Sequence, residues 1–272
     1  MNSKMNEHKE PPTAYTRKSV YALLFLALLG FTSCSDGDGI ASSSQVFPEF
    51  RLTHNWDGTP VTNADFNTLK FTNANGELLS IERLRYVISD IIFRTNNNEN
   101  LVFDVYNLVD VTNGTNLRFS PQIRIPKGSY NVSFTFGFDN EDNSENYLGL
   151  NSESFNVPDI LGGGYHYMQF DGKFLNDENV AQGFNYHTIR AVDNPGINPT
   201  FPQDTFINVN LGTITITDDP EIEVQMNIAQ WFKEPNLWDL NVLNQMLMPN
   251  SSAQIQMFEN GQNVFSLGSV TQ

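Results

Sequence analysis

The clearest hydrophobic pattern in the chain is a strict alternation from residue 130 to residue 138. Apolar side chains fall at every second position of this segment, and the positions between them hold Asn, Ser, Thr and Gly. Because successive side chains of a strand point to opposite faces, this period of two predicts an antiparallel strand with one buried face. Weaker forms of the same pattern predict further strands over 46–54, 68–73, 78–94, 101–108, 117–125, 165–174, 184–190, 205–211 and 221–228.

The C-terminal part of the chain has a different pattern. Its apolar residues recur at helical spacing, and this spacing predicts short helices over 229–233, 240–248 and 252–260. Turn signals such as Asn75-Gly76 separate the earlier segments, as is typical of strands joined by hairpins. The whole pattern predicts one all-β domain over 46–272, an antiparallel β-sandwich with a short helical C-terminal segment.

Residues 1–33 have the features of a lipoprotein signal peptide. Arg17 and Lys18 precede an apolar run over 20–31, which is too short to span a bilayer and typical of a signal-peptide core. Cys34 is the only cysteine of the chain, and it stands where such a signal is cleaved and lipidated. Residues 34–45 are rich in Ser, Asp and Gly and predict a flexible tether to the domain.

This leader predicts a protein that is anchored by lipid in the outer membrane, on its periplasmic or its cell-surface face. Several acyl chains together hold a protein on a membrane stably, whereas a single chain does so only marginally. The acidic residues that follow Cys34 resemble a surface-export signal found in lipoproteins of one Gram-negative phylum. The alternative is an ordinary secretory signal, in which Cys34 has no anchoring role.

Charge and cysteine content exclude several classes of function. The formal net charge of −16 repels nucleic acid, so we expect no nucleic-acid partner. With a single cysteine, the chain can form neither an internal disulfide nor a metal or redox site built from several cysteines. The sequence also lacks a nucleophile elbow, a zincin motif and a kinase signature. We therefore expect a protein that is not an enzyme.

The stretch from Gly162 to Gly172 holds the first candidate for chemistry. In a strand, His166 and Met168 would share one face, and an imidazole beside a thioether is a donor pair that suits copper. The other histidines beyond the leader, His54 and His187, also fall in or beside predicted strands. We expect these four side chains to form a metal site; the alternative is that each histidine is a hydrogen-bonded core residue.

Two other motifs bear on ligand binding. The loop around Asp139, Asp142, Asn143 and Glu145 offers several oxygen ligands within eight residues and is a weak candidate for calcium. It lacks the spacing of an EF-hand, so a solvated surface loop is the alternative. The run Gly162–Gly164 is not a phosphate-binding loop, because a strand follows it where that motif requires a helix. Positive φ angles or close backbone contacts explain these glycines better.

Several blocks of the sequence, in the same order, resemble the MbnP-like family, which is named for methanobactin-associated copper-binding proteins. The resemblance extends over about residues 47–268 and points to a lipoprotein subgroup of that family. The blocks that carry it are Leu84–Ile91, Pro126–Tyr130, Phe136–Asp139, Gly162–Met168, Tyr186–Thr188, Trp231–Pro235 and Asn260–Phe265.

The resemblance implies copper binding at the cell envelope. His54 and His187 match histidines of the family, whereas His166 and Met168 belong only to the block of the subgroup. Some members use a tryptophan that a di-haem peroxidase oxidises to kynurenine, but the segment 154–158 contains no tryptophan. A kynurenine ligand is therefore excluded at that position. The resemblance also implies a di-haem peroxidase or an outer-membrane transporter as partner.

Two hypotheses of different classes follow. The first is a lipid-anchored, non-enzymatic β-sandwich that binds copper, or another transition metal, for capture or hand-over through His54, His166, His187 and Met168. The second is a surface interaction module that binds a protein partner or a glycan without a metal. The distances among the three imidazoles discriminate between the two hypotheses.

Overall fold

The computed structural model describes residues 44–272, so the expected signal peptide, Cys34 and most of the expected tether lie outside the described residues. Strands dominate the described part. They are β1 (Gln45–Val46), β2 (Glu49–Trp56), β3 (Thr59–Pro60), β4 (Phe71–Thr72), β5 (Leu78–Leu79), β6 (Arg83–Thr95), β7 (Asn100–Asp110), β8 (Arg118–Phe119), β9 (Ile125–Pro126), β10 (Gly128–Phe136), β11 (Met168–Leu175), β12 (Ala181–Thr188), β13 (Ile207–Ile216), β14 (Glu221–Asn227) and β15 (Phe265–Thr271).

Helical segments are few and short. The α-helices are α1 (Leu148–Ser152) and α2 (Ser251–Gly261), and the 3₁₀ turns are η1 (Asn63–Asp65), η2 (Asp142–Ser144), η3 (Asp159–Leu161) and η4 (Ile228–Phe232). Among the residues that the structure describes, no helix combines the length and the apolar character that a membrane span requires.

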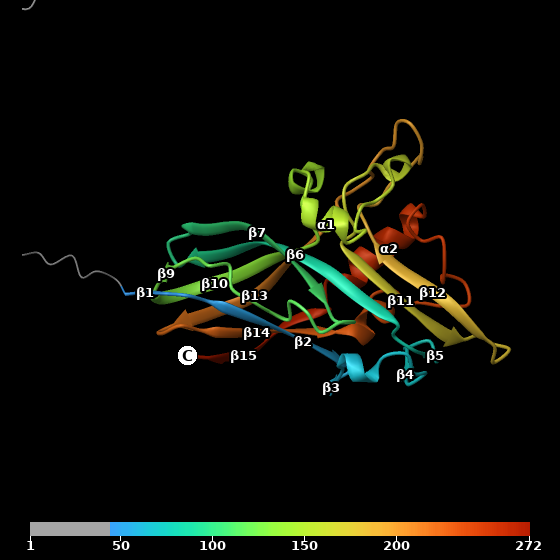
Figure 1. The fold of residues 1–272 in the computed structure, drawn as a ribbon, viewed down its shortest axis with the longest axis horizontal. Helices are drawn as coiled ribbons and strands as arrows, with labels where there is room; N and C mark the ends of the chain where they lie inside the picture. The colour runs from blue at the N-terminus through green and yellow to red at the C-terminus, as the bar shows by residue number, and fades with distance from the viewer. Residues whose placement is uncertain (1–43) are drawn as a thin grey trace, which may run out of the picture. The chain divides into compact units, whose positions relative to one another are not determined.

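The strands form two large curled sheets and one small one (Figure 1). The eight-stranded sheet has the order β13-β10-β6-β11-β5-β4, with β7 also paired to β6 and β12 to β11. The five-stranded sheet has the order β15-β14-β2-β3, with β8 paired to β2. Strand β6 extends through the larger sheet, with β7 along one side and β10 and then β11 along the other, and β12 pairs with β11.

The two large sheets pack face to face through aromatic side chains. Phe50 of β2 contacts Phe93 of β6, and Phe265 of β15 lies against both Tyr86 and Phe134 of the other sheet. Aromatic rings bury a large apolar area each, which is why a few such pairs hold two sheets together. The expected all-β, sandwich-like fold with a short C-terminal helix is confirmed.

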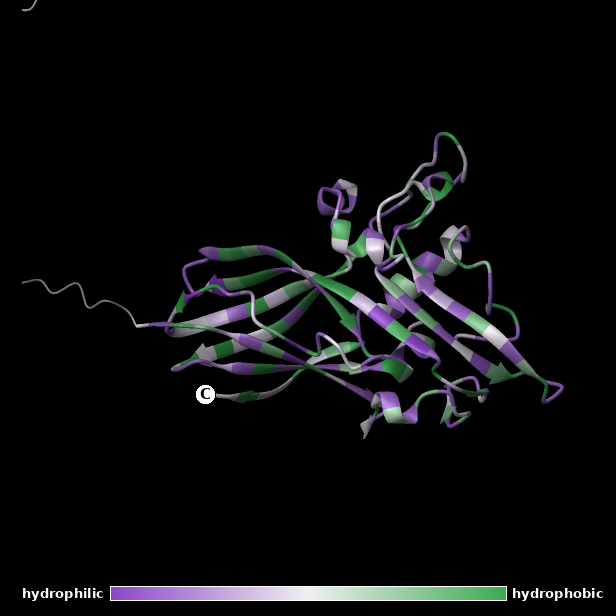
Figure 2. Ribbon diagram, viewed as in Figure 1, coloured by the Kyte–Doolittle hydropathy of each residue, from purple (hydrophilic) through white to green (hydrophobic). Residues whose placement is uncertain are grey.

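Strand β10, which has the clearest alternation in the sequence, buries its apolar face in the core. Tyr130, Val132, Phe134 and Phe136 of β10 are all at most 3% exposed and belong to the core. Hydropathy along the strands changes from residue to residue, as expected for sheets with one face on the core (Figure 2). One pairing departs from the antiparallel expectation, because β2 and β14 run parallel. These strands are far apart in the sequence, so no hairpin dictates their relative direction.

Not every predicted element forms. The helix over 252–260 is confirmed as α2, and 229–233 is the 3₁₀ turn η4. The prediction of a helix over 240–248 is wrong, since this segment consists of turns. Met246 has φ +56°, a left-handed conformation that a right-handed helix does not contain. The predicted strand over 117–125 is reduced to β8 and the first residue of β9, and Gln122 with φ +58° interrupts it.

The core of β10 provides a matched test of the fold. Val132 is fully buried, whereas Val102, on β7 of the same sheet, is 55% exposed. We expect Val132→Ala to lower the free energy of unfolding by about 2 kcal/mol, because it removes buried methyl groups and leaves a cavity. Val102→Ala should change it by less than about 0.5 kcal/mol. Urea unfolding of both variants measures the difference, and equal losses would contradict the assignment of the core.

Candidate functional site

The chain around His166 departs from the strand alternation that the sequence predicts. Strand β11 begins only at Met168, and all residues from 165 to 170 are buried. The backbone N–H of His166 donates to the carbonyl of Phe155 at 2.9 Å, and the ring atom Nδ1 bonds the same oxygen at 2.9 Å. These two bonds join His166 to the segment before η3, and not to a neighbouring strand of the sheet.

Met168 faces the core of the sheet, on the opposite side from the histidines. It is fully buried and lies opposite Tyr86 and Thr188 in the ladders with β6 and β12. Two residues further along the same face, Phe170 packs against Phe232 in the core. The prediction that His166 and Met168 share one strand face is therefore wrong, because His166 precedes the strand.

His187 lies on the outer face of β12, paired with Gln169 of β11. Its Nε2 is 2.8 Å from Oδ1 of Asp171, which Asn185 and Arg83 also contact. Burial alone would raise the pKa of Asp171, but the bonds from His187 and its neighbours lower it to about 2. A carboxylate only accepts, so Nε2 of His187 is the donor. Within the described residues, Nδ1 of His187 makes no hydrogen bond.

His166 and His187 converge on the same place. Their ring centroids are 5.2 Å apart with an interplanar angle of 82°. Nε2 of His166 lies 3.2 Å from the sulfur of Met248, which comes from the loop between η4 and α2. Burial lowers the pKa of His166 to about 4, so the ring is neutral near pH 7. The structure thus brings together two imidazoles and one thioether.

The contact between His166 and Met248 is electrostatically unusual. Because Nδ1 of His166 must donate to the Phe155 carbonyl, Nε2 of the neutral ring is an acceptor. A thioether sulfur is also only a weak acceptor. Two acceptors at 3.2 Å have no proton to share. A cation between or beside them would satisfy both lone pairs, and these donor types suit a soft transition metal.

An apolar pocket opens beside this site. It has a volume of about 590 Å³, and both His187 and Met248 line it. Its other walls are almost entirely apolar and include Ile160, Leu161 and Met246. Met246 is 78% exposed and places a second thioether at the same pocket. His187 and the sulfur of Met248 are therefore reached from the surface past apolar and sulfur-bearing side chains.

His54 does not take part in this arrangement. It lies in β2, and its Nε2 is 3.0 Å from the hydroxyl of Tyr86. Burial lowers the pKa of His54 to about 4, which makes it a neutral core residue at pH 7. Within residues 44–272, the ring nitrogens of the three histidines do not all lie within 4.8 Å of one another. The predicted site of three histidines with Met168 is therefore not formed, and only His166 and His187 meet.

Sequence reasoning missed three residues of the site. Met248 supplies the thioether expected from Met168, Asp171 holds His187, and Phe155 holds His166 through its carbonyl. The signal for Met248 is the pair of methionines at 246 and 248, two residues apart and directly before Pro249. The predicted helix over 240–248 conceals this signal, because it makes the two methionines part of a regular helical pattern. Backbone carbonyls such as that of Phe155 leave no signal in a sequence.

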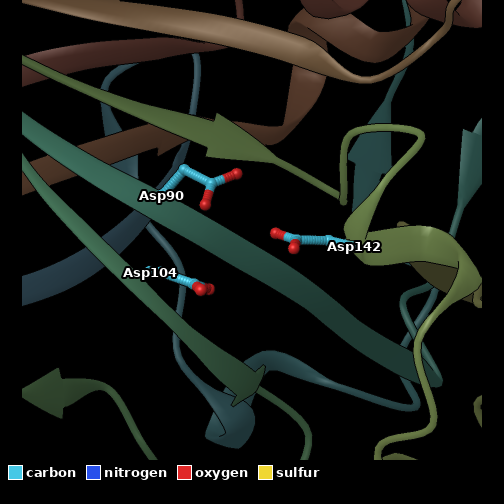
Figure 3. A group of neighbouring side chains, drawn as sticks. All are labelled: Asp90, Asp104 and Asp142. Carbon is cyan, nitrogen blue, oxygen red and sulfur yellow. The ribbon is translucent and has the colours of Figure 1, made fainter.

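A cluster of carboxylates lies elsewhere in the fold (Figure 3). Asp90 of β6, Asp104 of β7 and Asp142 of η2 point toward one another, with oxygen atoms within 4.8 Å. Asp90 has φ +49° where the register of β6 and β7 shifts, and such a bulge redirects a side chain. Burial, followed by repulsion from Asp90, Asp139 and Asp104, raises the pKa of Asp142 to about 7.

This cluster differs from the calcium loop that the sequence predicts. Of the four predicted side chains, only Asp142 belongs to it. Asn143 is buried and accepts a hydrogen bond from the backbone N–H of Tyr165 at 2.9 Å, whereas Glu145 is exposed. Asp139 accepts bonds from the backbone of its own turn. The predicted set of Asp139, Asp142, Asn143 and Glu145 therefore does not form one group of ligands.

The raised pKa of Asp142 makes stability depend on pH. The folded state holds this proton more tightly than the unfolded state, so stability is lost as pH rises from about 4 through about 7. We expect Asp142→Asn to raise Tm at pH 8 and to leave it nearly unchanged at pH 5. Asp177→Asn, at an exposed position, serves as control. Thermal unfolding at both pH values is the measurement, and a lower Tm of the variant at pH 8 would contradict the repulsion.

Comparison with known proteins relates this chain to a family. Among curated proteins, none matches the sequence. The structure is similar to that of "MbnP from Methylosinus trichosporium", with a TM-score of 0.47 and 10% sequence identity, covering 71% of this chain and 80% of that one. The family model described as MbnP matches residues 44–251, which is most of the chain and includes His166, His187 and Met248. The chain therefore belongs to the MbnP family.

Proposed function

We propose that this protein binds copper at the cell envelope through His166, His187 and Met248, for capture or hand-over and without catalysing a reaction. The observation that carries the proposal is the contact between Nε2 of His166 and the sulfur of Met248, two acceptors at 3.2 Å. The ring of His187 lies beside them with its Nδ1 free. This is a ready set of three soft or borderline donors.

The donor set favours copper over other metals. Thioether and imidazole ligands select copper, and a thioether favours its reduced state in particular. Calcium and magnesium prefer oxygen ligands, which this site lacks among the three donors. Membership of the MbnP family supports a copper-related role. When bound here, copper would be held by the two rings and the sulfur.

The groups behind the ligands support the same function. Histidine ligands of metals usually donate their second ring N–H to a carboxylate or a carbonyl. His187 has such a partner in Asp171 and His166 has one in the carbonyl of Phe155. These bonds fix both rings and leave the other ring nitrogen of each to face a ligand. The rings are thus oriented before any metal arrives.

The cellular setting remains part of the proposal. The leader over 1–33 and Cys34 favour attachment by lipid to the outer membrane, on its periplasmic or its cell-surface face. A protein held there would encounter copper before it reaches the cell interior. A di-haem peroxidase or an outer-membrane transporter is the partner that the family resemblance suggests. The apolar walls of the pocket beside His187 offer such a partner a surface for contact.

A matched pair of methionine variants tests the ligand set. We expect Met248→Leu to weaken Cu(I) binding at least tenfold, because it removes the thioether and keeps the volume. Met168→Leu should bind Cu(I) like the wild type, since Met168 faces the core. Asp171→Asn should cost about 10- to 100-fold, as is typical of groups that hold a ligand. Competition with a chromogenic Cu(I) chelator measures all three affinities. Equal binding by wild type and Met248→Leu would refute the assignment.

Met246 is expected to affect the rate of copper uptake and not the final affinity. Its thioether is exposed at the pocket that leads to His187, so it can take up Cu(I) first. We expect Met246→Leu to slow transfer of Cu(I) from a weak chelator several-fold, with an unchanged equilibrium constant. Stopped-flow absorbance follows the transfer. An unchanged rate, or a loss of equilibrium affinity as large as that of Met248→Leu, would contradict this role.

A further inference from the structure

A second pocket, separate from the copper site, has the features of a ligand-binding site. Its volume is about 390 Å³, and it shares no lining residue with the pocket that contains His187. Its walls come from the loop over 140–146, from the glycine run, and from Arg190 and Phe201. The volume is at the lower end of the range for small-molecule sites, so a small ligand fits.

The glycine run builds one wall of this pocket. Gly162 and Gly164 have φ +96° and +74°, conformations that other residues rarely adopt. A Cβ atom on Gly162 would overlap the ring of Phe201, and one on Gly164 would lie 2.7 Å from the side-chain amide of Asn143. Both glycines are therefore required for Phe201 and Asn143 to take their places in the wall.

Arg190 lines the pocket, and its guanidinium has no hydrogen-bond or ion-pair partner among the described residues. Its guanidinium carbon lies 3.7 Å from the ring centroid of Phe201, and this stacking holds the planar group in place. Its Nε atom is buried and has no hydrogen-bond partner within the described chain. Because Nε is covered, the terminal Nη groups of Arg190 are the ones that can donate to a ligand in the pocket, preferably to a group that accepts two parallel bonds.

Asn143 supplies a second donor at the same pocket. Asn143 is only 7% exposed, and its Oδ1 accepts a hydrogen bond from the backbone N–H of Tyr165 at 2.9 Å. That bond fixes the orientation of the amide, so Nδ2 is the free end of the side chain. Asn143 lines the pocket, and the amides of Asn146 and Asn156 with the carboxylate of Glu145 add further polar groups.

We propose that this pocket binds a small hydroxylated carboxylate, with Arg190 and Asn143 as donors to the carboxylate oxygens. A carboxylate matches the fork of a guanidinium, and the amide and carboxylate groups of the wall can bond hydroxyls. A phosphate dianion is disfavoured, because Glu145 lines the pocket and the chain carries a net charge of −16. The inference does not depend on copper binding, since the two sites share no lining residue.

The test uses D-glucuronate, D-gluconate and L-malate as probes, with D-glucose and inorganic phosphate for comparison. Binding to the purified protein is followed by NMR, with the amide signals of Gly163 and Gly164 as reporters of the site. We expect saturable shifts with carboxylates in the millimolar range and no shift with D-glucose. Absence of binding by all three carboxylates, or tighter binding of inorganic phosphate, would overturn the proposal.

Variants of arginine complete the test. Arg190→Gln should weaken carboxylate binding at least tenfold, whereas Arg124→Gln should leave it unchanged. Arg124 also stacks on an aromatic ring, that of Phe47 at 4.7 Å, but it is exposed and lines no wall of this pocket. If Arg190→Gln fails to fold, Arg190→Lys keeps the charge and removes the fork, and it should also bind more weakly. Binding by a folded Arg190 variant as tight as that of the wild type would refute the assignment.

Discussion

The carbonyl of Phe155 is the acceptor on which the candidate copper site depends. It takes hydrogen bonds from both the backbone and the ring of His166, and its two lone pairs allow this. These bonds hold the chain before β11 against the segment around Phe155, and the imidazole lies on the side of His187. Without them, strand alternation would place His166 on the core face with Met168. One backbone oxygen thus decides which donors meet.

The pairing of β11 with β12 provides the other half of the site. It places Asp171 and His187 on the outer face of the sheet, while Met168 and Tyr186 face the core. The register is fixed by burial, since a shift by one residue would exchange the two faces. The carboxylate of Asp171 then selects the tautomer of His187. The same strand pair therefore carries core residues on one face and site residues on the other.

The glycine run connects the two pockets. On one side it allows the approach of Phe201 and Asn143 to the Arg190 pocket, and two residues later the chain reaches His166. The backbone N–H of Val157 bonds to the carbonyl of Gly164 at 2.9 Å, next to the bond between His166 and Phe155. The conformation of this loop therefore contributes to the position of residues at both sites.

The sequence by itself determined the all-β class, most of the long strands, the helix α2 and the family resemblance. A period of two over a nine-residue segment is a local property of the chain, as are the order of motifs and the glycine run. It also identified His166 and His187 as candidates. Only the tertiary structure decided that Met248 and not Met168 accompanies them, and that His54 bonds Tyr86 in the core. These outcomes depend on a backbone carbonyl and on a loop some sixty residues beyond β12, and no local pattern records such contacts.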